Sequence, residues 1–222
     1  MNLKKELFNT YVNRITDFQR IHELCQASIC GPLLMSPNER YALQSNPLLI
    51  IGRETNGWGT FNSPITQEEF RKMIDVYEEF YVGKNYYSSP FWNVTRKIES
   101  ALGNEPLSCA WTNISKYDQD CTTPDAKHEK ILSAVDDLLI DEIKIIKPKV
   151  CIFLTGPYFD YRINNIFKAV EFLPVHGFNL RQLCQLKHEQ LPILTFRTYH
   201  PNYLRRSGLE KQFIEFINRL KL

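Results

Sequence analysis

Hydrophobic residues at the start of the chain recur every three or four positions, which is the spacing that places side chains on one face of a helix. The recurring set is Leu7, Tyr11, Ile15, Phe18, Ile21 and Cys25. This pattern predicts an amphipathic N-terminal helix over residues 3–27 whose apolar face packs against the rest of the protein.

Four later segments are almost continuously apolar, as are strands that are buried on both faces of a sheet. They cover residues 47–52, 107–113, 149–156 and 193–197. Segments with helical patterns separate these strands, and several of them begin with a capping box or an early proline.

Five such helices are expected. The first begins at the capping box Thr66–Glu69 and ends near Tyr81, the second begins at Pro90, and the third covers Thr123 to Lys147. The fourth covers residues 160–169, and the fifth begins at the capping box Ser207–Glu210 and forms the C-terminal helix.

The alternation of strand and helix predicts an α/β protein with a three-layer α/β/α arrangement around a central four-stranded, mostly parallel sheet. The chain has 222 residues, enough for one sizeable core, so we expect a single domain over 1–222. Residues 171–190 fit either short strands or an insertion.

The formal net charge is only +2, so any contact with nucleic-acid phosphates has to come from a local basic patch. Most of the six cysteines have apolar neighbours, as buried thiols do, and no signal peptide or membrane-length apolar run is present. We therefore expect a cytoplasmic monomer that does not contact membranes. The cluster His22, Cys25 and Cys30 has irregular spacing for a metal site, so no metal and no cofactor is expected.

Polar motifs follow three of the predicted strands. They are Gly52–Trp58, Trp111–Asn113 and Thr198–Pro201. The carboxyl ends of parallel strands meet at one edge of a sheet, where open α/β sheets bind their ligands. We therefore expect the side chains of these three motifs to lie around one site.

The three motifs, in this order and at these strand ends, resemble those of the uracil-DNA glycosylase superfamily. Members carry a Gly-x-Asp or related polar motif after the first strand, an Asn after the second, and a His-Pro-x-x-Leu loop after the last. Here the loop reads His200-Pro-Asn-Tyr-Leu204. The resemblance extends from about Pro47 to the C-terminal helix. It implies a DNA-repair enzyme that flips uracil or a related damaged base out of DNA and hydrolyses its N-glycosidic bond.

The resemblance assigns a role to each motif. Glu54 holds the attacking water and faces the cationic sugar, and His200 donates a hydrogen bond to the pyrimidine O2. Asn113 reads the Watson–Crick edge of the flipped base, because an amide offers both a donor and an acceptor. Trp58 and Phe91 are candidates for stacking on the base, together with Tyr86 and Tyr87.

The stretch Tyr199–Arg206 is the expected DNA-binding loop. By the same resemblance, Leu204 fills the space that the flipped base leaves, while Arg205 and Arg206 contact the phosphates beside it. Tyr203 belongs to the same contact surface.

The chain departs from the superfamily pattern in three ways. Thr55 and Asn56 follow Glu54, where the best-known uracil-specific members have Pro-Tyr, the tyrosine of which excludes thymine. Glu54 is one methylene longer than the usual Asp, which shifts the position of the water that it holds. A shift of about one ångström in the attacking water costs about 100-fold in rate. The four-cysteine iron–sulfur pattern of some branches is absent from the sequence.

Local roles explain the same residues without any catalysis. Glu54 can pair with Arg53, the His200 ring can bond the backbone of a turn, and Asn113 can cap a turn. Leu204 can pack onto the core, and the tryptophans fit core positions. The alternative function is therefore a catalytically altered superfamily member that binds nucleic acid or another partner without base excision; a third is hydrolysis of another nucleobase-containing substrate.

Overall fold

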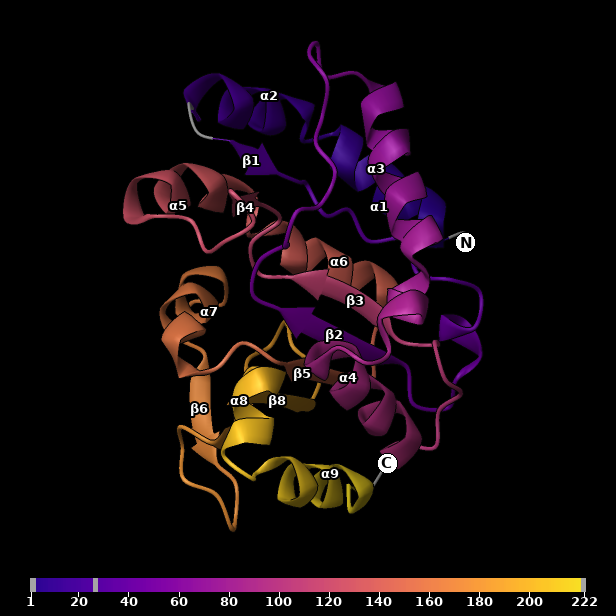
Figure 1. Ribbon diagram of the computed structural model, residues 1–222, viewed down its shortest axis with the longest axis vertical. Coiled ribbons are helices and arrows are strands. Elements are labelled where there is room, and N and C mark those ends of the chain that lie inside the picture. The colour runs from indigo at the N-terminus through magenta and orange to yellow at the C-terminus, as the bar shows by residue number, and fades with distance from the viewer. Residues whose placement is uncertain (1–2, 26–27, 221–222) are drawn as a thin grey trace. The chain divides into compact units, whose positions relative to one another are not determined.

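The computed structural model describes residues 3–25 and 28–220 (Figure 1). Their contacts group into two compact units. Unit 1 comprises Met1–Ser36, Arg53–Glu79 and Thr112–Ile146, and unit 2 comprises Pro37–Gly52, Phe80–Trp111 and Lys147–Leu222. The chain alternates between them, so neither unit is a continuous stretch of sequence. The single domain expected from chain length stays a prediction.

Unit 2 contains the central sheet, which has six strands within the described residues. In spatial order they are β3 (Ala110–Asn113), β2 (Leu48–Gly52), β5 (Val150–Phe153), β8 (Leu194–Thr198), β7 (Leu183–Lys187) and β6 (Glu171–Pro174). The last two residues of β3 group with unit 1. Every residue of β2 and β5 is buried, which explains their uninterrupted apolar sequences.

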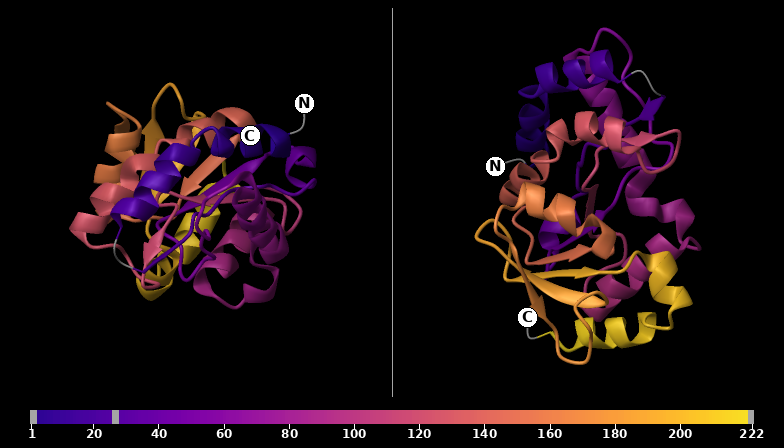
Figure 2. Two further views of the ribbon diagram at one scale, coloured as in Figure 1. Left: turned by 90° about the horizontal axis from the view of Figure 1, so that it is seen from above. Right: turned by 90° about the vertical axis from the view of Figure 1, so that its left-hand side faces the viewer.

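The sheet is mixed. β5 pairs in parallel with β2 and with β8, whereas β7 runs antiparallel to both β8 and β6. An α/β fold with a central sheet flanked by helices is therefore confirmed, but the prediction of four mostly parallel strands is wrong. The two additional strands come from residues 171–190, which pair as an antiparallel hairpin beside β8; Figure 2 shows this extension in orange. These strands mix polar with apolar residues and are partly exposed, so they lack the continuous apolar pattern of the central strands.

In unit 2, helix α4 begins where the sequence predicts, whereas the two C-terminal helices, α8 and α9, do not. α4 (Pro90–Ala101) opens with Ser89, whose hydroxyl accepts a hydrogen bond from the Trp92 amide. α4 packs against both α8 (Pro201–Arg206) and α9 (Glu210–Asn218). The stretch expected as a loop is thus mostly helix α8, and Leu209 precedes α9 without the side-chain cap predicted from Ser207. The remaining helices are α7 (Asp160–Ile166) and the short η1 (Tyr41–Leu43), η2 (Tyr81–Tyr86) and η4 (Pro157–Phe159).

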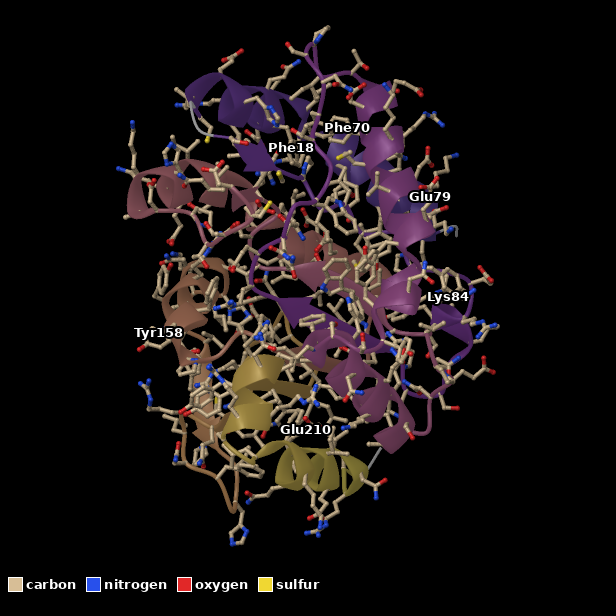
Figure 3. All side chains as sticks on the ribbon, viewed as in Figure 1. Phe18, Phe70, Glu79, Lys84, Tyr158 and Glu210 are labelled. Carbon is tan, nitrogen blue, oxygen red and sulfur yellow. The ribbon has the colours of Figure 1, made fainter. Side chains whose placement is uncertain are left out.

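Unit 1 consists mainly of helices around an aromatic core. Phe18 and Phe70, both labelled in Figure 3, are fully buried with ring centroids 5.3 Å apart, and Phe61 packs edge-on against Phe18. A short antiparallel pair, β1 (Ile29–Cys30) and β4 (Asp118–Gln119), completes the unit. The helices are α1 (Leu3–Val12), α2 (Ile15–Leu24), α3 (Gln67–Phe80), α5 (Ala126–Leu132), η3 (Ser133–Val135) and α6 (Leu138–Ile146).

Two long helices predicted for unit 1 are interrupted. The segment expected as one helix over 3–27 is α1 and α2, with residues 26–27 outside the described part of the chain. The segment expected to run to Lys147 is α5, η3 and α6. Arg14 lies at the first break and binds Asp137 at the second, with Nη2 and Oδ1 3.0 Å apart. A kink preserves the period of apolar residues along the sequence, so periodicity alone does not reveal it.

Among the described residues, no helix combines the length and the apolar character that crossing a membrane requires.

Candidate functional site

The segment after β2 is folded onto a buried carboxylate of unit 1. Asp118 is fully buried, and its Oδ2 accepts hydrogen bonds from Thr55 Oγ1 at 2.6 Å and from the Gly57 amide at 2.9 Å. Gly57 has a φ of +71°, a conformation that side chains disfavour. Residues 53–58 therefore form a fixed turn that carries Glu54.

Glu54 has local partners in unit 1. Its Oε1 accepts a hydrogen bond from Thr123 Oγ1 at 2.9 Å and lies 3.6 Å from Arg53 Nη2. Only 9% of the Glu54 side chain is exposed. Neighbouring groups thus position the carboxylate that is expected to hold water. The non-catalytic role of Glu54, pairing with Arg53, predicts local contacts of this kind as well.

Asn113 ends strand β3 and lies in unit 1 with Glu54. The amide of Ser115 donates to the Arg53 carbonyl at 2.8 Å, so a main-chain hydrogen bond joins the segments that carry Asn113 and Glu54. Asn113 is 1% exposed, and its buried Nδ2 has no hydrogen-bond partner among the described residues. A buried donor without a partner costs about 1–3 kcal/mol. Buried polar side chains with a purely structural role are normally hydrogen-bonded, so the unpartnered Nδ2 is unusual.

A buried ionic network flanks Asn113. Lys116 Nζ donates to Glu142 Oε2 and to Thr112 Oγ1, at 2.6 Å in both cases, and Lys116 and Glu142 are fully buried. Tyr11 donates to Glu142 Oε1 at 2.8 Å. Burial and the adjacent charge of Glu142 raise the pKa of Tyr11 well above its usual value, so Tyr11 stays a donor. Sequence reasoning missed this network because its members come from three distant segments.

His200 is the N-cap of α8 in unit 2. Its Nδ1 accepts a hydrogen bond from the Asn202 amide at 3.4 Å, and Pro201 occupies the first helical position. This interaction assigns the acceptor role to Nδ1, so in the neutral ring the proton lies on Nε2. The Phe91 ring of α4 lies 6.1 Å from the imidazole between centroids. The structure thus brings together two of the residues predicted for the site, His200 and Phe91.

Helix α8 presents a basic and aromatic surface in unit 2. Tyr203 is 46% exposed and packs on Tyr199 with ring centroids 4.5 Å apart, and the Arg206 guanidinium lies 5.9 Å from the Tyr203 centroid. A hollow of about 450 Å³ is lined by Pro90, Asn202, Arg205 and Arg206. Arg205 lies 3.5 Å from Glu210, which offsets part of its charge.

Leu204 is 1% exposed, because α8 turns it towards the interior of unit 2. A side chain buried to this extent does not reach a base stack. The assignment of Leu204 as the wedge is therefore corrected, and Tyr203 is the exposed ring that α8 presents instead.

The aromatic candidates separate into buried and exposed groups. Trp92 and Trp111 are buried and pack together with ring centroids 5.1 Å apart, as expected of core residues. Tyr86 and Tyr87 are exposed, whereas Trp58 is half-buried and belongs to unit 1.

Sequence reasoning missed Thr155 at the carboxyl end of β5. Its hydroxyl is buried and has no hydrogen-bond partner among the described residues. The adjacent Gly156 has a φ of +75°, and its amide donates to the Thr198 carbonyl at 2.9 Å. A side chain at Gly156 would come within 3.8 Å of the His200 amide. The Thr-Gly pair after a buried strand was the signal available in the sequence.

The residues best arranged to hold a metal are Cys30, Asp118 and Cys121 of unit 1, whose ligand atoms all lie within 4.8 Å of one another. In the described residues Cys30 therefore groups with Asp118 and Cys121, and not with His22 and Cys25, its neighbours in the sequence.

No protein-family model matches this chain, and no curated protein matches it either.

Proposed function

We propose that this protein is a DNA glycosylase that hydrolyses the N-glycosidic bond of uracil or a related damaged base. In this reaction the oxygen of water bonds to the sugar carbon, and the bond from that carbon to the base nitrogen breaks with its electron pair going to the base. The proton that the attacking water loses passes to solvent, and the base anion takes up a proton from solvent to leave as the free base. Glu54 orients the water and stabilises the positive charge on the sugar. His200 donates from Nε2 to the base oxygen as negative charge develops there.

The observation that carries the proposal is the unpartnered amide of Asn113. Folding buries its Nδ2 without a hydrogen-bond partner among the described residues, on a segment bonded to that of Glu54. A ligand carbonyl would satisfy this donor and recover the cost of burying it. A pyrimidine edge, with its carbonyl oxygen beside a ring N–H, matches an amide that donates and accepts.

The orientation of His200 gives independent support. Since Nδ1 accepts from the Asn202 amide, a neutral imidazole presents its proton at Nε2. A donor that needs no protonation step is suited to a leaving base that carries negative charge.

The test is release of free base from single- and double-stranded oligonucleotides that contain uracil or deaminated purines. We expect release by the wild type and a loss of about 10²–10⁴-fold in Glu54→Gln, which keeps the shape of the side chain but removes its charge. Asn113→Ala should lose about ten- to a hundredfold. Its free energy of unfolding should not fall by more than about 1 kcal/mol, because the mutation relieves the cost of an unpartnered buried donor.

Failure of the wild type to release base from any of these substrates would contradict the proposal. A large loss of stability in Asn113→Ala would instead assign this residue a structural role.

The second candidate is binding of nucleic acid or another partner without base excision. The contacts of Glu54 Oε1 with Thr123 and Arg53 favour it, because both groups compete with water for that carboxylate oxygen. Salt-sensitive DNA binding without base release, unchanged in Glu54→Gln, would select this candidate. Release of base from free nucleosides but not from DNA would select a third, a nucleoside hydrolase.

A further inference from the structure

Two thiols and a carboxylate meet at the β1–β4 pair of unit 1. Cys30 pairs with Asp118 in register, and the turn after β4 returns Cys121 to the same place. The Cys121 amide donates to Asp118 Oδ1 at 2.9 Å, and Asp120 and Cys121 have φ angles of +49° and +60°. The turn is thus wound tightly around the carboxylate, and it brings the Cys121 thiol to Cys30.

The electrostatics of this cluster favour a cation. Asp118 is fully buried, Cys30 is half-buried and Cys121 is exposed. The three ligand atoms lie within 4.8 Å of one another, and each group carries negative charge when it is ionised. Ionised forms of the three groups therefore oppose one another, and a bound cation would remove that repulsion. The exposed Cys121 leaves a path from solvent.

We propose that Cys30, Asp118 and Cys121 bind one thiophilic divalent cation, of which Zn²⁺ is the clearest example, with water as the fourth ligand. Binding forms two metal–sulfur bonds and one metal–oxygen bond, and the two thiol protons pass to solvent. Tetrahedral zinc, with bonds of about 2.3 Å to sulfur and about 2.0–2.2 Å to oxygen, requires ligand atoms about 3.5–3.8 Å apart. Atoms within 4.8 Å of one another are within about one ångström of that arrangement.

Asp118 keeps the capacity to bind a metal. Its carboxylate accepts from the Cys121 amide, Thr55 Oγ1 and the Gly57 amide, which uses three of about four acceptor positions. Hydrogen bonds of this kind orient a ligand towards its metal. They also join the site to residues 53–58, so a bound cation would stabilise that turn. This inference does not depend on base excision.

The experiment is a calorimetric titration in which zinc chloride is added to reduced protein from which a chelator has removed all metal. We expect one Zn²⁺ per chain for the wild type and for the control Cys25→Ser, which changes another thiol of the same unit. Cys30→Ser and Cys121→Ser should each weaken binding by more than about 100-fold, above the usual cost of losing an outer-shell partner. With cobalt chloride, the wild type should show thiolate-to-metal absorption that both variants lack.

The proposal fails if the reduced wild type takes up no zinc, or if Cys30→Ser and Cys121→Ser bind it as tightly as Cys25→Ser does. Asp118→Asn is a weaker test, because Asp118 also holds Thr55 and Gly57 in place. Loss of the cobalt spectrum with normal unfolding temperatures in the cysteine variants separates ligation from folding.

Discussion

At the scale of single residues, His200 combines two roles that the sequence motif does not distinguish. Its Nδ1 caps α8, as the structural interpretation predicts, and this same bond assigns the proton of the neutral ring to Nε2, as the catalytic role requires. A helix N-cap and a hydrogen-bond donor are therefore compatible in one side chain. Substitutions that replace one ring nitrogen at a time can separate the two roles.

His200→Asn retains an acceptor near the position of Nδ1, whereas His200→Gln places its amide near that of Nε2. We expect His200→Asn to lower base release by about 10²–10³-fold, the usual cost of losing one donor to a developing anion. Its unfolding temperature should stay near that of the wild type, because asparagine is a good N-cap. His200→Gln should retain more activity and lose more stability. If one of the two variants retained more of both the activity and the stability, the roles assigned to the two ring nitrogens would be contradicted.

At the scale of elements, the end of β3 depends on a buried ion pair. Thr112, next to Asn113, binds both Lys116 and Glu142. Removal of one partner of a buried ion pair leaves the other charge buried without compensation, which destabilises the protein. Through Thr112 the pair is joined to the residue beside Asn113, although neither charge is exposed to a ligand.

Lys116→Met should lower the free energy of unfolding by about 3–5 kcal/mol, because Glu142 would stay buried without its main cation. The double variant Lys116→Met/Glu142→Leu should recover most of that loss, as apolar replacement of a buried pair often does. Chemical denaturation of the four proteins of this cycle measures the coupling. A single variant with wild-type stability would show that the pair does not hold this segment.

At the scale of the whole molecule, a net charge of +2 leaves phosphate binding to a few local cations. Arg206 is the clearest of these, because it borders the hollow beside Tyr203, whereas Arg205 lies near Glu210. DNA affinity should therefore depend only weakly on salt in comparison with strongly basic proteins.

Arg206→Ala should reduce the slope of log affinity against log salt concentration by about 0.9 for duplex DNA or about 0.7 for single strands, the value for one phosphate contact. The control is Lys211→Ala, which removes an exposed cation of α9 outside the lining of this hollow. Fluorescence anisotropy at several salt concentrations measures both slopes. Equal slopes for Arg206→Ala and the wild type would exclude a phosphate contact by Arg206.

The sequence by itself determined the elements whose signals are local. The apolar runs of β2 and β5, and the Ser-Pro start of α4, need no distant partner to be recognised, and these elements lie where they were predicted. The same holds for the polar motifs at the strand ends. It also holds for the general α/β class, because the strand and helix periods alternate along the chain.

Only the tertiary structure decided which side chains meet. The burial of Leu204, the Lys116–Glu142 pair and the meeting of Cys30 with Asp118 and Cys121 all depend on contacts between segments that are separated along the chain. Such contacts form where packing and burial fix them, and no local period or spacing encodes them.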